Sequence, residues 1–205
     1  MKFLLISGSH RDDSQSTKIA NWMADNLAAK DESFEVDILD LASSDIPFWD
    51  VSAWDQSSDL SAQMKPYLER VTQADAFVLI APEWGGMVPA MLKNFLLYIG
   101  TKEAGHKPAL IVGVSSGRGG KYPMSELRIS GYKNSRLVHI PDHLIVQNCE
   151  NVMNDADINS GDEGDQEIKK RADHSLYVLS AYAKALKTMR DSVEGLFNPK
   201  FPFGM

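Results

Sequence analysis

The sequence predicts an α/β fold, a doubly wound sheet of five parallel strands with helices on both faces. Short apolar and β-branched runs alternate along the chain with segments of helical periodicity. The central runs are apolar at successive positions, as strands buried on both faces of a sheet must be. Parallel strands need crossover connections, and this strict alternation supplies a helix for each of them.

The first strand is predicted at residues 2–7, and Ile19, Met23 and Leu27 then share one face of a helix that also carries Trp22. The remaining strands are predicted at 34–39, 76–81, 109–114 and 144–148, and the remaining helices at 60–73, 88–99, 122–134 and 165–190. Two strand orders fit this pattern, the classical dinucleotide-binding order and the order 2-1-3-4-5. In both orders ligands bind beyond the carboxyl ends of the strands, so the loops after the first, third and fourth strands form the candidate site.

Composition favours one globular domain that covers residues 1–205, because a hydrophobic content of 43% is enough to form a core. The 28 acidic residues outnumber the 21 Lys and Arg residues, and the net charge of -7 argues against binding to nucleic acid or to an anionic membrane. No apolar run is long enough for a membrane span or a signal peptide, so a soluble, cytoplasmic protein is expected. Cys149 is the only cysteine, which excludes an internal disulfide and predicts a buried apolar side chain.

The stretch GSHRDDSQSTK, residues 8–18, joins the first strand to its helix. It lacks both the glycine pattern that binds a dinucleotide pyrophosphate and the P-loop pattern that binds ATP. Its donors are the N–H groups at the helix start, one guanidinium and four hydroxyl groups, from Arg11, Ser9, Ser14, Ser16 and Thr17. These groups predict a site for one dianionic monophosphate. The alternative is that Ser14 or Ser16 only caps the helix and that Arg11 is a solvated surface charge.

The loops after the third and fourth strands are rich in glycine. In the loop at 81–95, Gly85 and Gly86 allow the backbone to approach a flat ligand, and Trp84 offers a ring to stack on it. The loop at 115–123, SSGRGGKYP, contains three glycines and many N–H donors. With the phosphate loop these segments would form one crevice, with the ring system of a ligand against the second and third loops. The alternative is a tryptophan packed on the sheet edge and glycines that serve only turns.

Four stretches together resemble the flavodoxin-like NAD(P)H-dependent FMN reductases, a family that includes quinone, azo-dye and chromate reductases. They are GSHRDDSQS, the PFWD of 47–50, PEWGGMVPAMLKN, and SSGRGG followed by LR at 127–128. The family signature G-S-x-R-x-x-S appears as Gly8, Ser9, Arg11 and Ser14, and P-E-Y-N appears as Pro82, Glu83, Trp84 and Gly85. The resemblance spans about residues 1–150 and implies a flavodoxin-like sheet of order 2-1-3-4-5.

The resemblance also implies FMN as the cofactor, with its phosphate on the first loop and its ring between the second and third. The implied cofactor-binding residues are Ser9, Arg11, Ser14, Gln15, Ser16, Pro82, Glu83, Trp84, Gly85, Ser116, Gly117, Gly119 and Gly120. No catalytic side chain is implied, because the flavin carries the chemistry. NADPH or NADH would donate hydride, and the acceptor would be a quinone, an azo compound, a metal oxyanion or free flavin. Trp84 and Gly85 replace a smaller ring and an Asn of the family, which changes the expected substrate preference more than FMN binding.

Two expectations concern the surroundings of the flavin. Arg11, Arg118 and Lys121 are the candidates for contact with a phosphate of NADPH. Four aromatic residues that a five-stranded domain would struggle to cover predict a homo-oligomer, a homodimer or homotetramer: Phe48, Trp49, Trp54 and Trp84.

Two other functions stay open as alternatives, a one-electron carrier of the flavodoxin type and an interaction module without a redox role. No metal site is expected. Asp155, Asp157 and Asn159 match the first ligands of a calcium loop, but Ser160 and Gln166 stand where that loop needs Gly and Glu.

Overall fold

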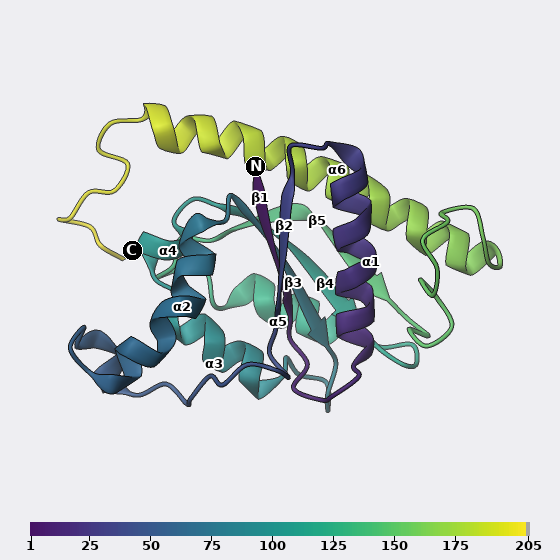
Figure 1. Ribbon diagram of the computed structural model, residues 1–205, viewed down its shortest axis with the longest axis horizontal. Coiled ribbons are helices and arrows are strands. Elements are labelled where there is room, and N and C mark those ends of the chain that lie inside the picture. The colour runs from purple at the N-terminus through teal and green to yellow at the C-terminus, as the bar shows by residue number, and fades with distance from the viewer. Residues whose placement is uncertain (204–205) are drawn as a thin grey trace.

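The computed structural model describes residues 1–203 and contains the parallel sheet that the sequence predicts (Figure 1). The strand order is β2-β1-β3-β4-β5 and every neighbouring pair is parallel, so the order is 2-1-3-4-5 and not the classical dinucleotide-binding one. The strands are β1 (Lys2–Ser7), β2 (Glu35–Asp40), β3 (Ala76–Pro82), β4 (Pro108–Val114) and β5 (Val138–Val146).

Helices cover both faces of the sheet (Figure 1). One face packs against α1 (Gln15–Lys30) and α6 (Glu163–Ser192). The other face packs against α2 (Asp59–Gln73), α3 (Ala90–Tyr98), α4 (Thr101–Ala104) and α5 (Lys121–Ile129). Successive strand residues enter opposite cores, as the side-chain alternation of a strand requires: Phe3 and Leu5 face α1 and α6, whereas Leu4 and Ile6 face the other layer. No helix within residues 1–203 has the length and apolar character needed to cross a membrane.

The prediction for the last strand was wrong at its start, because β5 begins at Val138 and not at 144. Its first half contains Pro141 and a bulge, which hid the strand pattern in the sequence. An edge strand tolerates both features, and β5 pairs only with β4. The bulge leaves backbone carbonyls without a partner in the sheet, and the Arg128 guanidinium donates to them. The acceptors are the carbonyls of Ile140, Pro141 and Asp142, at 3.0, 2.8 and 3.2 Å.

Two further differences involve short segments, and the terminal segment adds a feature for which no prediction was made. The fourth predicted helix ends at Ile129 and not at 134. Two single-turn elements, α4 and the 3₁₀ helix η1 (Val51–Trp54), were not predicted because one turn leaves no periodicity to recognise. After α6 the chain does not run out into solvent but turns back toward α4 (Figure 1).

The acidic segment between β5 and α6 is organised around the buried ammonium group of Lys169. Its Nζ lies 3.0 Å from Asp155 Oδ1, 2.8 Å from Asp165 Oδ2, 2.9 Å from Ser160 Oγ and 3.1 Å from the Asp157 carbonyl. Desolvation lowers the pKa of Lys169, but the hydrogen bonds and charges of Asp165 and Asp155 outweigh it and raise the pKa. The segment that resembles a calcium loop thus surrounds a cation of the chain itself. Residues 1–203 contain no group of three or more His, Cys, Asp or Glu side chains that could hold a metal.

Candidate functional site

The loop after β1 is held close to the sheet by Gly8. Its N–H donates to the Ile80 carbonyl at 2.8 Å, and a Cβ at this position would lie 2.7 Å from that oxygen and 2.8 Å from Leu92 Cδ2. Any side chain here would push the loop away from β3. The glycine is therefore required by the approach of the backbone, and it fixes where the loop leaves the sheet.

The end of this loop is fixed by a hydroxyl network under the start of α1. Ser14 is the N-cap, and its Oγ accepts the Thr17 N–H at 3.2 Å. The Thr17 hydroxyl donates to Asp40 Oδ2 at 3.1 Å and lies 2.9 Å from both Ser7 Oγ and Ser14 Oγ. Ser14 is thus a helix cap, as the alternative interpretation of the sequence held, and the Thr17 hydroxyl points inward to Asp40. The N–H groups at the start of α1 are still available to a ligand.

Several polar groups at this helix start have no partner within the described chain. Ser16 Oγ and Gln15 Oε1 are buried and form no hydrogen bond in residues 1–203. The backbone N–H groups of Ser14, Gln15 and Ser16 likewise donate to no group of that part of the chain. Unpaired buried polar atoms are costly unless a ligand or water satisfies them, and here they gather at the positive end of the α1 dipole. Ser16 Oγ and the three N–H groups are donors that fit an oxyanion, whereas Gln15 Oε1 is an acceptor.

Two cations flank this helix start, and they behave differently. The Arg11 side chain is exposed and forms no ion pair within the described residues. Lys18, one turn into α1, points to the segment after β5, where it donates to the Val152 carbonyl at 2.9 Å, to Asn154 Oδ1 at 2.7 Å and to the Cys149 carbonyl. Arg11 is therefore the side-chain cation that is free to meet an anion at the loop.

The loop after β3 forms a tight turn that presents Trp84. Trp84 and Met87 exchange two backbone hydrogen bonds of 3.2 and 3.1 Å, and the residues between them, Gly85 and Gly86, have φ values of 59° and 74°. Two successive left-handed residues make Gly the favoured residue at both positions. The indole of Trp84 is half-buried, and the His10 ring meets it in an edge-on arrangement with centroids 4.5 Å apart. The first and second loops therefore touch through these two rings.

Two carboxylates of the same region hold this turn against α5. Glu83 Oε2 accepts the N–H of Gly120 at 2.6 Å and that of Tyr122 at 3.3 Å. Glu126 accepts the Val88 N–H at 2.7 Å and pairs with Lys93, also at 2.7 Å. Gly120, the N-cap of α5, has no side chain to cap the helix, so Glu83 supplies the acceptor from the neighbouring loop. The second and third loops are thereby joined at both ends of the Trp84 turn.

The loop after β4 turns back over the strand it leaves. A Cβ on Gly113 would lie 1.9 Å from the Gly120 carbonyl oxygen, so the close crossing of these two residues requires Gly113. Gly120 itself has a φ of 94°. Gln147 ties the loop to the end of β5, donating to the Gly119 carbonyl at 3.2 Å and to the Arg118 carbonyl. Ser116, Gly117 and Arg118 remain exposed at the tip.

A fourth segment, residues 43–58, lies beside α3. Asn94 accepts the Trp49 N–H at 2.8 Å and donates to the Pro47 carbonyl at 2.7 Å, and the Tyr98 hydroxyl donates to the same carbonyl at 3.1 Å. The anchored loop keeps Trp49 half-buried, whereas Phe48 and Trp54 are both 77% exposed. Of the four aromatic residues expected on the surface, two are therefore largely open to solvent and two, Trp49 and Trp84, are half-buried.

The predicted site residues thus lie in three loops and at the ends of the elements that border them, where adjacent strands reach the carboxyl end of the sheet. Four residues that fix the loops were not predicted from the sequence: Glu126, Gln147, Asn94 and Lys18. No sequence pattern indicates them, because each bonds backbone groups that are far away along the chain. Cys149 is buried as predicted, and burial raises the pKa of its thiol.

Comparison with known proteins agrees with this geometry. A model of the family described as NADPH-dependent FMN reductase matches residues 1–151 of the chain. The FMN-dependent NADPH-azoreductase of Staphylococcus saprophyticus is 33% identical over 133 residues, which are 63% of this chain and 68% of the relative. An NADPH azoreductase of a Bacillus species is 30% identical over 131 residues, with the same two coverages of 63% and 68%.

Solved structures share the fold at lower identity. The flavoenzyme NAD(P)H:(acceptor) oxidoreductase of Paracoccus denitrificans superposes with a TM-score of 0.64 and 20% identity, covering 91% of this chain and 97% of the other. An oxidoreductase of Corynebacterium diphtheriae superposes with a TM-score of 0.65 and 13% identity, covering 90% and 97% of the two chains. Both extend the similarity in fold into the region beyond residue 151.

Proposed function

The chain belongs to the NADPH-dependent FMN reductase family and is an NAD(P)H-dependent oxidoreductase that uses FMN, and we propose that it passes hydride from NAD(P)H by way of FMN to a flat or small electrophilic acceptor. The acceptor class comprises quinones, azo compounds, metal oxyanions and free flavin. When bound, FMN supplies the redox chemistry, and the protein binds, orients and exposes it.

The observation that carries the proposal is the group of unsatisfied donors at the start of α1. Ser16 Oγ and the N–H groups of Ser14, Gln15 and Ser16 fit one terminal phosphate, and Ser9 and Arg11 border them. A dinucleotide would need a second phosphate site, for which this loop has no glycine fingerprint. The donor set thus fits FMN better than FAD. The exposed side chain of Arg11 would add a charge-assisted hydrogen bond to this phosphate from the solvent side.

The ring of FMN would be held by the second and third loops. Pro82, Trp84 and Gly85 would border it from one side, with Glu83 acting through its hydrogen bond to Gly120. On the other side the third loop offers backbone N–H groups, from Ser116, Gly117, Gly119 and Gly120. Of these, Gly117 and Gly120 already donate within the protein, to Ser115 Oγ and to Glu83. The N–H groups of Ser116 and Gly119 have no acceptor within residues 1–203, so these two are the ones that would meet the ring.

The exposed surroundings of the site support two finer proposals. Arg11, Arg118 and Lys121 are exposed at its rim and would contact a phosphate of NADPH. Phe48 and Trp54 would be covered by a second copy of the chain in a homodimer or homotetramer, because such large exposed aromatic side chains are uncommon on a monomer surface. We place this activity in the cytoplasm.

The acceptor is tested by steady-state oxidation of NADPH and NADH with the FMN-loaded protein and a panel of quinones, azo dyes, metal oxyanions and free FMN. The proposal expects turnover with at least one of these classes and no turnover by protein from which FMN has been removed. Azo compounds are in the panel because the relatives of known activity are azoreductases. Oxidation of NAD(P)H that reaches none of the acceptors would contradict the proposal.

A further inference from the structure

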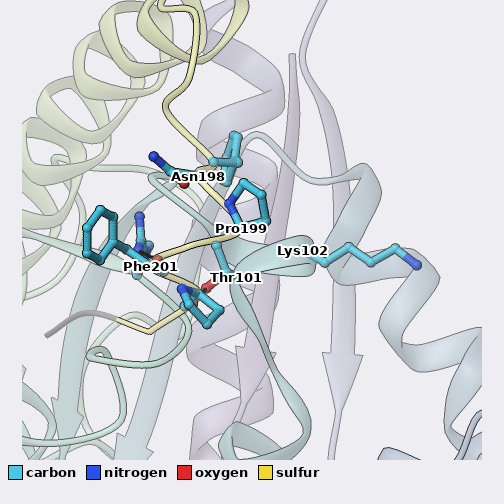
Figure 2. Close-up of a pocket in the computed structure, with 8 residues that line it drawn as sticks. Thr101, Lys102, Asn198, Pro199 and Phe201 are labelled. Atoms are coloured by element: carbon cyan, nitrogen blue, oxygen red, sulfur yellow. Dashed lines mark hydrogen bonds between the residues drawn. The ribbon is translucent and has the colours of Figure 1, made fainter.

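A cavity of about 450 Å³ lies at the opposite edge of the sheet from the three loops (Figure 2). It is walled by Thr101 and Lys102 of α4, by Arg136 just before β5, and by the returning C-terminal tail at 197–202. These elements precede β4 and β5, so the cavity sits at the amino ends of the strands. It is separate from the crevice to which FMN is assigned.

The tail is attached to the body by specific contacts. Arg136 donates to the carbonyls of Phe203, at 3.2 Å, and Phe201. The Phe197 ring packs edge-on against His106 with centroids 5.5 Å apart. Gly105 makes this possible, because a Cβ there would lie 2.6 Å from the Phe197 ring. The cavity is open to solvent, and the docked tail forms one of its walls.

The walls are apolar, and one cation faces them. Half of the lining residues are phenylalanines and prolines of the tail: Phe197, Pro199, Phe201 and Pro202. Figure 2 shows Phe201 and Pro199 around the space and the Lys102 side chain extending away from it. Arg136 thus remains the cation of the cavity wall.

Arg136 is incompletely satisfied in this position. Within residues 1–203 it forms no ion pair with a carboxylate, and its Nε is buried without an acceptor. Its neighbour His106 adds no second positive charge, because burial together with the charges of Arg136 and Arg190 lowers the pKa of that imidazole. A half-buried guanidinium without a carboxylate partner, beside apolar walls, favours a ligand that combines an oxyanion with a flat apolar body.

We propose that this cavity binds a small aromatic carboxylate, with the carboxylate on Arg136 and the ring against the phenylalanine and proline side chains. The volume lies within the range of roughly 300–1,000 Å³ that is typical of small-molecule sites. The site is distinct from the acceptor site of the proposed reductase, and it does not depend on that activity.

The test is isothermal titration of the FMN-saturated protein with 2-naphthoate, with 2-naphthamide as the uncharged analogue. We expect one naphthoate per chain and binding at least about tenfold weaker for the amide and for the Arg136→Gln variant, since a lost charge-assisted hydrogen bond costs at least that much. The matched control Arg118→Gln, an arginine at the other edge of the sheet, should keep the wild-type affinity. The NMR signals of the His106 ring should shift on binding.

A second variant separates the cavity wall from the attachment of the tail. Phe201→Ala removes a ring from the wall but keeps the backbone carbonyl that Arg136 binds. It should weaken naphthoate binding while leaving the melting temperature close to that of the wild type. Absence of naphthoate binding at millimolar concentration, equal affinity in Arg136→Gln, or a His106 signal that does not move would each overturn the proposal.

Discussion

The carboxylate of Glu83 accepts the N–H of Gly120 at 2.6 Å and so joins the loop after β3 to the N-terminus of α5. This single contact connects the two loops to which the ring of FMN is assigned. Glu83 is therefore proposed to act on the cofactor indirectly, as a positioning residue.

Glu83→Ala should lower both stability and FMN affinity. The change leaves the N–H groups of Gly120 and Tyr122 without their acceptor, and a hydrogen bond to a charged group contributes about 1.5–3 kcal/mol. Glu83→Gln keeps an acceptor oxygen and should lose less. Urea unfolding and quenching of FMN fluorescence on binding measure the two effects. Glu69→Ala, at an exposed position of α2, is the control and should change neither quantity.

Arg11→Ala should weaken FMN binding by a factor of about ten to a hundred, since the charge-assisted contact contributes about 1.5–3 kcal/mol. The melting temperature should stay unchanged, because the Arg11 side chain is exposed and forms no ion pair within residues 1–203. Arg118→Ala is the comparison variant and should keep the affinity for FMN. Equal FMN affinity of Arg11→Ala and the wild type would make Arg11 a surface charge only.

Lys169→Met should destabilise the fold by about 3–5 kcal/mol. The Lys169 side chain is fully buried, and its removal leaves the buried Asp165 carboxylate without its counter-charge. The midpoint of urea unfolding reports the loss. Lys170→Met, the next residue of α6, has an exposed side chain and should have little effect. A small loss in Lys169→Met would mean that water replaces the ammonium group among these oxygens.

His139 should stay neutral throughout the physiological pH range. Burial, with a smaller contribution from the charge of Arg128, lowers the pKa of this imidazole to about 4. The unfolded chain takes up this proton near pH 6.5 while the folded chain does not, so stability is lost as the pH falls from about 6.5 to 4, by at most about 3 kcal/mol. Titration of the His139 ring by NMR measures the pKa. His139→Gln should flatten the pH dependence of unfolding over this interval.

The five parallel strands were predictable because they depend on apolar periodicity, which is local in the sequence. Periodicity left two strand orders open, and only the family resemblance favoured the order 2-1-3-4-5 that the sheet has. The strand at 144–148 was predicted with the wrong start because Pro141 and the bulge interrupt that periodicity, and the strand survives only through edge position and Arg128. Gly85 and Gly120 indicated loops in the sequence. Their positive φ angles explain why glycine is favoured at these two positions.

The contacts that fix the loops could not be predicted in the same way. Glu83 bonds Gly120, and Lys18 bonds groups after β5, so each pairs with a backbone far away along the chain. In the segment at 155–166, the spacing of a calcium loop could be recognised in the sequence. The cation that fills the segment could not be predicted, because Lys169 comes from a helix whose placement depends on the whole fold.

The central claim is that NAD(P)H reduces FMN held in the crevice of the three loops. The most direct test mixes the FMN-loaded protein anaerobically with excess NADPH or NADH in a stopped-flow spectrometer and follows the absorbance of oxidised flavin. We expect rapid and complete bleaching in a single two-electron step with at least one of the two donors. Bleaching by dithionite but by neither NADPH nor NADH would contradict the proposed reductase activity and favour a one-electron carrier. Failure to bind FMN at all would favour an interaction module.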